Sequence, residues 1–489
     1  MEGTNGGDIV LRTAAYSRLT RLNSNLETVP DLATEWESNE ANNEWTFVLN
    51  EDATFSNTGG QSVLAEDVEA TIEMIMENPD SAAAGNLGAF DSIEIEDDHR
   101  FTIKLEQDNL FYPKNLAEAD NRFVILPKNI VEDRREEITQ TDYGSGPFTI
   151  VEHNSGDNLQ FEANDDYHIT DDEGNALPYV DECTWQLIVD PSAQMNGLRD
   201  QRVDALQFTP QSQMAQLEAT DGIDTIERPS TSFISIVLNT TVETENGDRP
   251  FADPNVRKAM KHAVDLEDMR AVTDDKLVVS NHHPVTPAHE FHPDFDIGLE
   301  FGTTAQPDRA RELLEEAGYS NGLELPTMYY SADNSPSRGP TSVQFQEQMG
   351  NAGIDFDIQR LTADVWLSDY WNQEGVWYAS GYAGRLVDST VANLALRSGA
   401  PWNSARWSNE EYDEAHDRMN NASTAEEFSE ALAEAMRIHH LDGGWIVTGT
   451  EVFMSAANDY VRNVDPLPTE SIDYHYNNWL TSDAPEGPQ

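Results

Sequence analysis

Aromatic side chains are concentrated in one stretch of the chain, between residues 366 and 407. Five of the ten tryptophans lie there together with three tyrosines: Trp366, Trp371, Trp377, Trp402, Trp407, Tyr370, Tyr378 and Tyr382. Rigid rings supply a large apolar contact area at a low cost in conformational entropy, as a pocket for a small molecule requires. The alternative is that they fill the core of a domain. Trp402 is the strongest candidate for a ligand contact, because its neighbours Pro401 and Asn403 indicate a loop.

Histidines form a second concentration, with four of them in the segment 282–292: His282, His283, His289 and His292. Glu290 and Asp294 lie beside them, and imidazole with carboxylate suits Ni²⁺ or Zn²⁺. The segment is, however, a proline-rich loop without the i, i+4 helical spacing of strong metal motifs, and loop histidines are often solvated. We therefore expect no metal here, and no cofactor elsewhere.

Sequence patterns that would indicate catalysis are absent. The chain contains none of the motifs G-x-S-x-G, G-x-x-x-x-G-K-[ST], G-x-G-x-x-G or H-E-x-x-H. Scattered carboxylates mean little in a chain with 90 acidic residues, because most of them must be solvated. We expect a binding protein rather than an enzyme.

The charge balance is extreme. Against 90 acidic residues stand 29 basic ones, which gives a formal net charge of -61. Such a surface repels itself in dilute buffer, whereas at about 1 M salt the Debye length falls to about 3 Å and screens the repulsion. The acidic residues are spread between apolar periodic segments, which favours a folded, salt-adapted protein over an acidic disordered one. The lack of a basic stripe excludes nucleic acid as a partner.

Length and segment composition set further limits. A chain of 489 residues exceeds a single core, so we expect two or three domains. Cys183 is the only cysteine, which excludes a disulfide framework. No run of 18 apolar residues is available to span a membrane, and the first nine residues are too polar for a signal peptide. If the protein is exported, we expect its targeting segment to have been removed.

The elements that must position these residues alternate between strand and helix. In the first half, periodicity and turn residues predict a strand, a helix, two hairpins and a strand–helix–strand unit at residues 44–50, 68–76, 92–105, 148–163 and 184–209. A polar loop at 240–249 marks a domain boundary. Beyond it we expect helices and strands in turn, at 254–264, 310–317, 323–330, 341–349 and 354–361. This order predicts an α/β domain whose sheet is covered on both faces.

Several blocks of the sequence follow the order of one known family. They are Pro30–Trp36, Trp45–Leu49, Ala65–Val68, Gly144–Phe148, Asn164–Tyr167, Arg249–Ala259, Leu313–Tyr319 and Asn351–Ile354. In these blocks the chain resembles the extracellular solute-binding proteins of ABC transporters, family 5, which bind dipeptides, oligopeptides or nickel. Within that family it resembles haloarchaeal members.

The resemblance implies a bilobal, periplasmic-binding-protein-like fold of the class II type. Two α/β lobes are then joined by hinge strands, and the first lobe carries an extra inserted subdomain. On this basis lobe I comprises residues 1–31, 165–239 and 455–489, the inserted subdomain comprises 32–164, and lobe II comprises 240–454. Family members have a first strand and a leader ahead of the segment that matches Tyr16–Leu22, so lobe I looks truncated at its N-terminus.

The resemblance also implies a function. The protein would act as a monomer outside the cytoplasmic membrane, capture a peptide-like, oligosaccharide or other small organic solute between its lobes, and deliver it to an ABC permease. Family members are often tethered by a lipid-modified cysteine ahead of the mature fold, which this chain lacks. Two alternatives remain: an importer component that binds nickel or a metal chelate, and a cell-surface structural module without a small ligand.

One segment departs from the family pattern. In the resembling peptide binders, the segment that matches residues 381–388 carries an aspartate that pairs with the free amino group of the peptide. That aspartate aligns with Arg385 here, and a second acidic position aligns with Asp388. Because a cation cannot anchor an ammonium group, Arg385 either receives an anionic or polyhydroxyl ligand group or forms a structural ion pair with Asp388. The predicted ligand contacts are Trp402, Tyr382, Arg385, Asp388, Asn403, Trp366 and Trp377.

Overall fold

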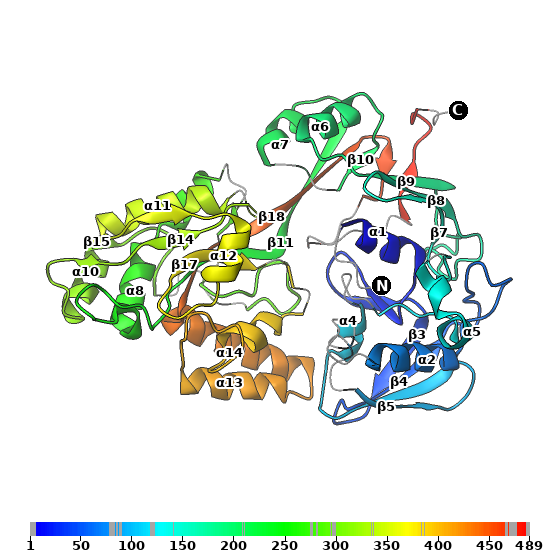
Figure 1. Cartoon of the computed structure of the whole chain (residues 1–489), viewed down its shortest axis with the longest axis horizontal. Coiled ribbons are helices and arrows are strands. Elements are labelled where there is room, and N and C mark those ends of the chain that lie inside the picture. Colours follow the sequence, from blue (N-terminus) through cyan, green and yellow to red (C-terminus); the bar gives the residue numbers. More distant parts are fainter. Residues whose placement is uncertain are drawn as a thin grey trace. The chain divides into compact units, whose positions relative to one another are not determined.

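The computed structural model divides the chain into two compact units. Unit 1 is Met1–Glu227 with Met454–Gln489, and unit 2 is Arg228–Phe453. Two long strands, β11 (Ile223–Val237) and β18 (Trp445–Asn458), each continue from one unit into the other (Figure 1). The structure describes residues 6–77, 84, 87, 90–117, 123–139, 141–207, 209, 211–273, 277–279, 282–293, 295, 300–333, 335, 337–382, 384, 385, 387–464, 468 and 477–485. Among these residues, no helix has both the length and the apolar character needed to cross a membrane. The predicted split of unit 1 into lobe I and an inserted subdomain stays a prediction.

A four-stranded antiparallel sheet organises part of unit 1, in the order β3–β4–β6–β5. Its strands are β3 (Ala33–Ser38), β4 (Glu44–Leu49), β5 (Phe90–Ile95) and β6 (Arg100–Leu105). The predicted alternation in β4 is confirmed, because Trp45, Phe47 and Leu49 are buried while the residues between them are not. The predicted helix is α2 (Ala65–Met76), whose apolar residues join Phe47 in one core.

A second sheet of unit 1 joins β7 (Phe148–Asn154), β8 (Asn158–Ala163) and β9 (Glu182–Gln186), near helix α1 (Gly6–Ala15). The Gly-Ser-Gly-Pro block before β7 passes directly over the end of α1. A Cβ atom on Gly144 would lie 1.8 Å from the carbonyl oxygen of Ala15, and one on Gly146 would lie 2.5 Å from its carbonyl carbon. Only glycine fits at these two positions, so this family block has a structural cause.

The remaining elements of unit 1 are short. They are β1 (Thr20–Leu22), β2 (Thr28–Pro30), α4 (Tyr112–Ala117), α5 (Lys128–Asp133), the 3₁₀ helix η1 (Arg135–Thr139), α6 (Pro191–Arg199), β10 (Ala205–Leu206), α7 (Gln211–Glu218), β19 (Val461–Arg462) and β20 (Trp479–Leu480). The strand–helix–strand unit predicted at 184–209 corresponds to β9, α6 and β10.

Unit 2 is built on a sheet in the order β18–β11–β17–β14–β16, with β12 on the other side of β18. The short strands are β12 (Leu277–Val278), β14 (Met328–Tyr330), β16 (Ile358–Arg360) and β17 (Tyr378–Tyr382). Strand β14 runs parallel to both β16 and β17, whereas β11 is antiparallel to β17. Helices α8 (Pro254–Ala263), α10 (Pro307–Glu316) and α11 (Arg338–Asn351) bury their apolar sides with these strands in one core (Figure 1).

Other helices complete unit 2. They are the 3₁₀ helix η2 (Pro250–Ala252), α9 (Leu266–Ala271), α12 (Ala363–Asp369), the π-helix η3 (Ala392–Leu396), α13 (Glu410–Asn420) and α14 (Ala425–Asp442). The helix predicted at 254–264 is α8. Its N-terminus forms as expected, because the Asp253 carboxylate accepts a hydrogen bond from the Asn255 backbone at 2.8 Å and Pro254 occupies the first turn.

Two predicted strands are each interrupted. The segment predicted at 323–330 divides into β13 (Leu323–Glu324) and β14, and the segment at 354–361 into β15 (Ile354–Asp355) and β16. Among the strands that the structure describes, β13 and β15 pair only with each other. Pro326 lies at the first break, where it has no N–H to donate to a neighbouring strand. Its carbonyl accepts a hydrogen bond from the Trp377 indole at 2.8 Å instead.

Candidate ligand-binding site

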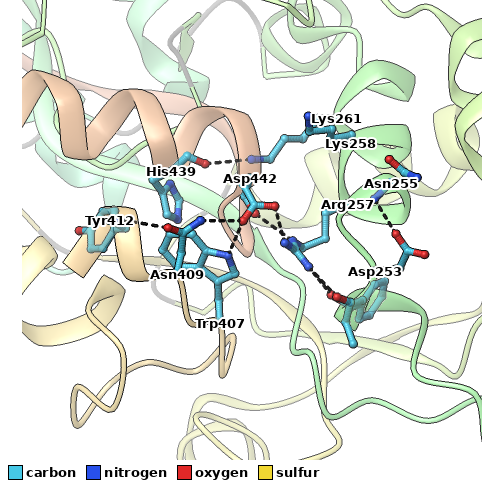
Figure 2. Close-up of polar contacts among 12 residues, drawn as sticks. Asp253, Asn255, Arg257, Lys258, Lys261, Trp407, Asn409, Tyr412, His439 and Asp442 are labelled. Atoms are coloured by element: carbon cyan, nitrogen blue, oxygen red, sulfur yellow. Dashed lines mark hydrogen bonds and ion pairs between the residues drawn. The ribbon is translucent and has the colours of Figure 1, made fainter. Parts of the chain in front are cut away.

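A buried polar network joins α8 to the C-terminus of α14 (Figure 2). Arg257, which is 4% exposed, donates from Nη2 to Asp442 Oδ1 at 2.5 Å and from Nε to the Asp442 carbonyl at 2.9 Å. One turn further along α8, Lys261 Nζ donates to the carbonyls of His439 at 3.1 Å and His440 at 2.7 Å. The last carbonyls of a helix lack partners within it, so these two cations satisfy them and complement the helix dipole. We call this arrangement the α14 clamp.

The Asp442 carboxylate extends the clamp to a third segment. Its Oδ2 accepts hydrogen bonds from Trp407 Nε1 and Asn409 Nδ2, both at 3.1 Å. Asn409 in turn caps α13, because its Oδ1 accepts from the Tyr412 backbone at 3.0 Å. The Asp442 carboxylate, through these hydrogen bonds, fixes the relative places of α8, α13 and α14. Separately, burial lowers the pKa of the Lys261 ammonium well below its usual value.

The histidine-rich segment packs against the end of α14, which shields most of its histidines from solvent. His282, His283 and His289 are buried, and His292 is half-buried. The His282 backbone donates to His440 Nδ1 at 3.2 Å, His439 Nδ1 donates to the His282 carbonyl at 2.9 Å, and the rings of His282 and His440 stack at 5.6 Å. We call residues 282–292 the His loop.

Several of these imidazoles are held neutral. Burial is the main cause that lowers the pKa of His282, His283 and His439 well below the usual value for histidine. Within the described part of the chain, no three residues of the types His, Cys, Asp and Glu are grouped so as to hold a metal ion. Asp294, which the sequence places beside the histidines, lies outside the described residues.

Two of the predicted aromatic contacts lie inside unit 2. Trp377 has 0% exposure and packs between the rings of Phe251 and Phe356, at 5.2 and 4.7 Å. Trp366 is also buried; its ring meets Tyr378 edge-on at 5.7 Å, and the guanidinium of Arg338 lies 5.8 Å from it. Both residues contribute to internal packing in this structure.

A second aromatic group reaches the surface. Tyr382 lies between two nearly parallel rings, Trp445 at 5.3 Å and Trp402 at 6.2 Å. Trp402 is half-buried and meets the half-buried Trp371 edge-on at 5.7 Å. We call Trp371 and Trp402 the Trp corner. Sequence reasoning missed Trp445, which lies outside the aromatic-rich stretch and reaches Tyr382 only through the strand order β18–β11–β17.

Hydrogen bonds hold the Trp corner in place. Arg406 donates to Asn372 twice, from Nη1 to the side-chain oxygen at 2.8 Å and from Nη2 to the carbonyl at 2.7 Å. Asn372 Nδ2 donates to the Pro401 carbonyl at 3.0 Å. The residue after Trp371 is thereby tied to the residue before Trp402. Such a brace fixes two large, partly exposed rings that would otherwise lose entropy on contact with a ligand.

The predicted polar contacts differ in what they touch. Asn403 Nδ2 donates to the carbonyls of Arg397 and Trp407, at 3.0 and 2.7 Å. The buried Asp388 accepts a hydrogen bond from the Phe291 backbone at 2.8 Å. Arg385 is half-buried, and none of the ion pairs among the described residues includes it. The structure therefore contains no Arg385–Asp388 ion pair.

The electrostatics connect Arg385 with the Trp corner. Burial raises the pKa of the Tyr382 phenol, and the positive charge of Arg385 acts on the same phenol in the opposite direction. Tyr382 in turn stacks on Trp402. A half-buried cation thus lies three residues after a buried tyrosine that stacks on the half-buried Trp402. This set suits a solute that carries both an anionic and an apolar group.

Comparison with known proteins identifies the family. The family model described as bacterial extracellular solute-binding proteins, family 5 Middle, matches residues 27–404. The chain belongs to this family. It is 23% identical to the dipeptide-binding protein DppE of Bacillus subtilis over 81% of this chain and 74% of that protein. It is 25% identical to the glutathione-binding protein GsiB of Pectobacterium atrosepticum over 77% of this chain and 72% of that protein.

A solved structure shows the same fold. The structure of HbpA2 from Haemophilus parasuis matches with a TM-score of 0.84 and 20% identity, over 98% of this chain and 96% of that one. The predicted fold class, a bilobal α/β fold of the periplasmic-binding-protein kind, is confirmed, and so is the predicted family. The ligand contacts of individual residues in this solute-binding protein stay predictions.

The α14 clamp predicts a large loss of stability when one partner is removed. Arg257→Ala removes the donors of the Asp442 carboxylate oxygen Oδ1 and of the Asp442 carbonyl, so the free energy of unfolding should fall by about 3–5 kcal/mol. Arg309→Ala is the control, because Arg309 pairs with Glu312 at the surface and should change stability by no more than about 1 kcal/mol. Urea denaturation followed by tryptophan fluorescence measures both. Equal, small losses would contradict the structural role of the clamp.

Neutral buried histidines predict acid sensitivity. Because the pKa of His283 is lower in the folded protein than in the unfolded chain, the unfolded chain binds the proton first, and stability falls as pH drops below about 6.5. Replacing His283 by Phe should reduce the slope of unfolding free energy against pH, by up to about 1.4 kcal/mol per pH unit between 6.5 and 5. His153→Gln, on an exposed strand position, serves as the control. Identical slopes in wild type and His283→Phe would refute this assignment.

Proposed function

We propose that this extracellular solute-binding protein captures an anionic, peptide-like solute on the surface of unit 2 formed by Arg385 and the Trp corner, and delivers it to an ABC permease. The observations that carry the proposal are the half-buried Arg385, which takes part in none of the ion pairs among the described residues, and its place three residues after Tyr382, whose ring stacks on Trp402. Guanidinium binds carboxylates with two parallel hydrogen bonds, and indoles take up apolar groups.

Several considerations support this choice. Relatives named as dipeptide-binding and glutathione-binding proteins are similar over most of the chain, and glutathione is itself an anionic tripeptide. Asn403 and Asp388 hold neighbouring backbone, so they position the surface rather than contact the solute. We further propose that the protein works as a monomer, without catalysis and without a nucleic-acid partner.

Calorimetric titration in about 2 M KCl tests the proposal. The titrants are glutathione, a neutral tripeptide and the same tripeptide with its C-terminus amidated. Tight binding should require the carboxylate. Arg385→Ala should weaken it by about 1.5–3 kcal/mol, which is roughly 10- to 150-fold in Kd.

Two controls separate the site from the fold. Trp402→Ala should also weaken binding, whereas Arg418→Ala, at an exposed ion pair with Glu434, should not. Unchanged affinity in Arg385→Ala would remove Arg385 as the anchor. Equal affinity for the amidated and free peptides would rule out an anionic ligand group.

We also propose that the protein is adapted to molar salt, as in haloarchaeal members of the family. The net charge of -61 is the supporting observation. Raising KCl from about 0.1 M to about 2 M should increase the melting temperature, most steeply at the lower KCl concentrations. Repulsion between carboxylates is screened once the Debye length drops below about 10 Å. Sucrose at equal osmolality serves as the control, because it does not screen charge. A melting temperature independent of KCl would contradict salt adaptation.

A further inference from the structure

The chain after β17 is tied to the His loop at two neighbouring points. We call residues 384, 385 and 387–389 the Arg385 loop. His289 Nε2 lies 3.0 Å from the Arg385 carbonyl oxygen, and the Phe291 backbone donates to Asp388 Oδ1 at 2.8 Å. His289 and Phe291 of the His loop therefore hold Arg385 and Asp388 of the Arg385 loop.

Hydrogen bonds on both edges hold the His289 ring. The Thr286 backbone N–H donates to His289 Nδ1 at 2.9 Å, and the hydroxyl and carbonyl oxygens of Thr286 lie 3.0 and 3.3 Å from the same nitrogen. The Arg385 carbonyl can only accept, so Nε2 carries the proton and donates it. The ring is 6% exposed, and both nitrogens have assigned partners. The His289 ring thus bridges the backbone of Thr286 and the backbone of Arg385, and we call it the spacer.

The spacer rests on rigid elements. Thr286 Oγ1 donates to the Ser230 carbonyl on β11 at 2.8 Å. The other end of the His loop is bonded to the last turn of α14 through His282, and Phe291 packs edge-on against Phe428 of α14 at 5.3 Å. The His loop is therefore fixed to β11 and to the α14 clamp, and His289 connects it to the backbone of Arg385.

We propose that His289 is a positioning residue, which sets the place of Arg385 and so the anion specificity of the site. The effect on ligand affinity rests on the proposed function; the effect on the loop does not. The His loop then serves as a support for the binding surface.

Two substitutions separate the two hydrogen bonds of His289. Glutamine is long enough to donate from Nε2 to the Arg385 carbonyl. Asparagine keeps an acceptor near the Thr286 N–H, but it is too short to reach Arg385. Hydrogen exchange of the free protein, followed by mass spectrometry, reports on the loops without any ligand. In His289→Asn, the peptide that spans the Arg385 loop should exchange about five- to tenfold faster, whereas in His289→Gln it should exchange as in wild type.

Peptides from α14 decide whether the effect is local. Unchanged exchange in Ala425–Asp442 for both variants supports positioning. Equal acceleration of α14 and the Arg385 loop in both variants would show that His289 only stabilises unit 2 and would overturn the proposal. So would wild-type exchange of the Arg385 loop in His289→Asn.

Titration with glutathione completes the test. His289→Asn should weaken its binding severalfold, His289→Gln should restore it, and His289→Asn should add nothing in an Arg385→Ala background. An added loss in that background would contradict action through Arg385. Wild-type protein that does not bind glutathione would count against the proposed function alone, because the exchange result is obtained on the free protein.

Discussion

The capping of α14 by Arg257 and Lys261 is the interaction on which unit 2 depends. The two cations occupy positions one turn apart on α8, and both point at the same helix end (Figure 2). From that end, β18 begins only three residues after Asp442 and places Trp445 against Tyr382. The connection has no room for side chains, because a Cβ on Gly443 would lie 2.3 Å from the His439 ring and one on Gly444 would lie 2.5 Å from Ala405. The clamp therefore determines where the aromatic stack forms.

The same helix end also supports the polar half of the site. His439 and His440 give their carbonyls to Lys261 and use their ring nitrogens to hold His282. The His loop that follows carries the contacts to the Arg385 loop. Each step in this series is a hydrogen bond to backbone, which leaves little freedom between α8 and Arg385. Burial of cations and imidazoles is costly unless every polar group finds a partner, and this explains why removal of one member should be felt throughout the series.

Local patterns predicted local structure well. The alternation around Phe47, the Asp253 cap of α8 and the family blocks all correspond to observed features, and Pro401 and Asn403 correctly indicated a loop at the half-exposed Trp402. Long-range packing could not be read in the same way. Trp377 and Tyr378 are adjacent and both buried. Trp377 lies just before β17 and packs between Phe251 and Phe356, whereas Tyr378 begins this interior strand and meets Trp366. The burial of the His loop depends on contacts with α14, such as that between His282 and His439, which are 157 residues apart in sequence. Composition carries no information on such a contact.

An anionic solute and a chain of net charge -61 are compatible once distance is considered. Repulsion from the many surface carboxylates acts over several ångströms of solvent, and at about 1 M salt the Debye length of about 3 Å suppresses it. A direct contact with a half-buried guanidinium is screened much less, because ions and water are partly excluded from it. Molar salt thus screens the long-range repulsion between the surface carboxylates and an anionic solute, and it leaves the short-range attraction of the solute to Arg385. Binding of an anion by this protein should then respond to salt in the direction opposite to that of an ordinary surface ion pair, growing stronger as the carboxylates are screened.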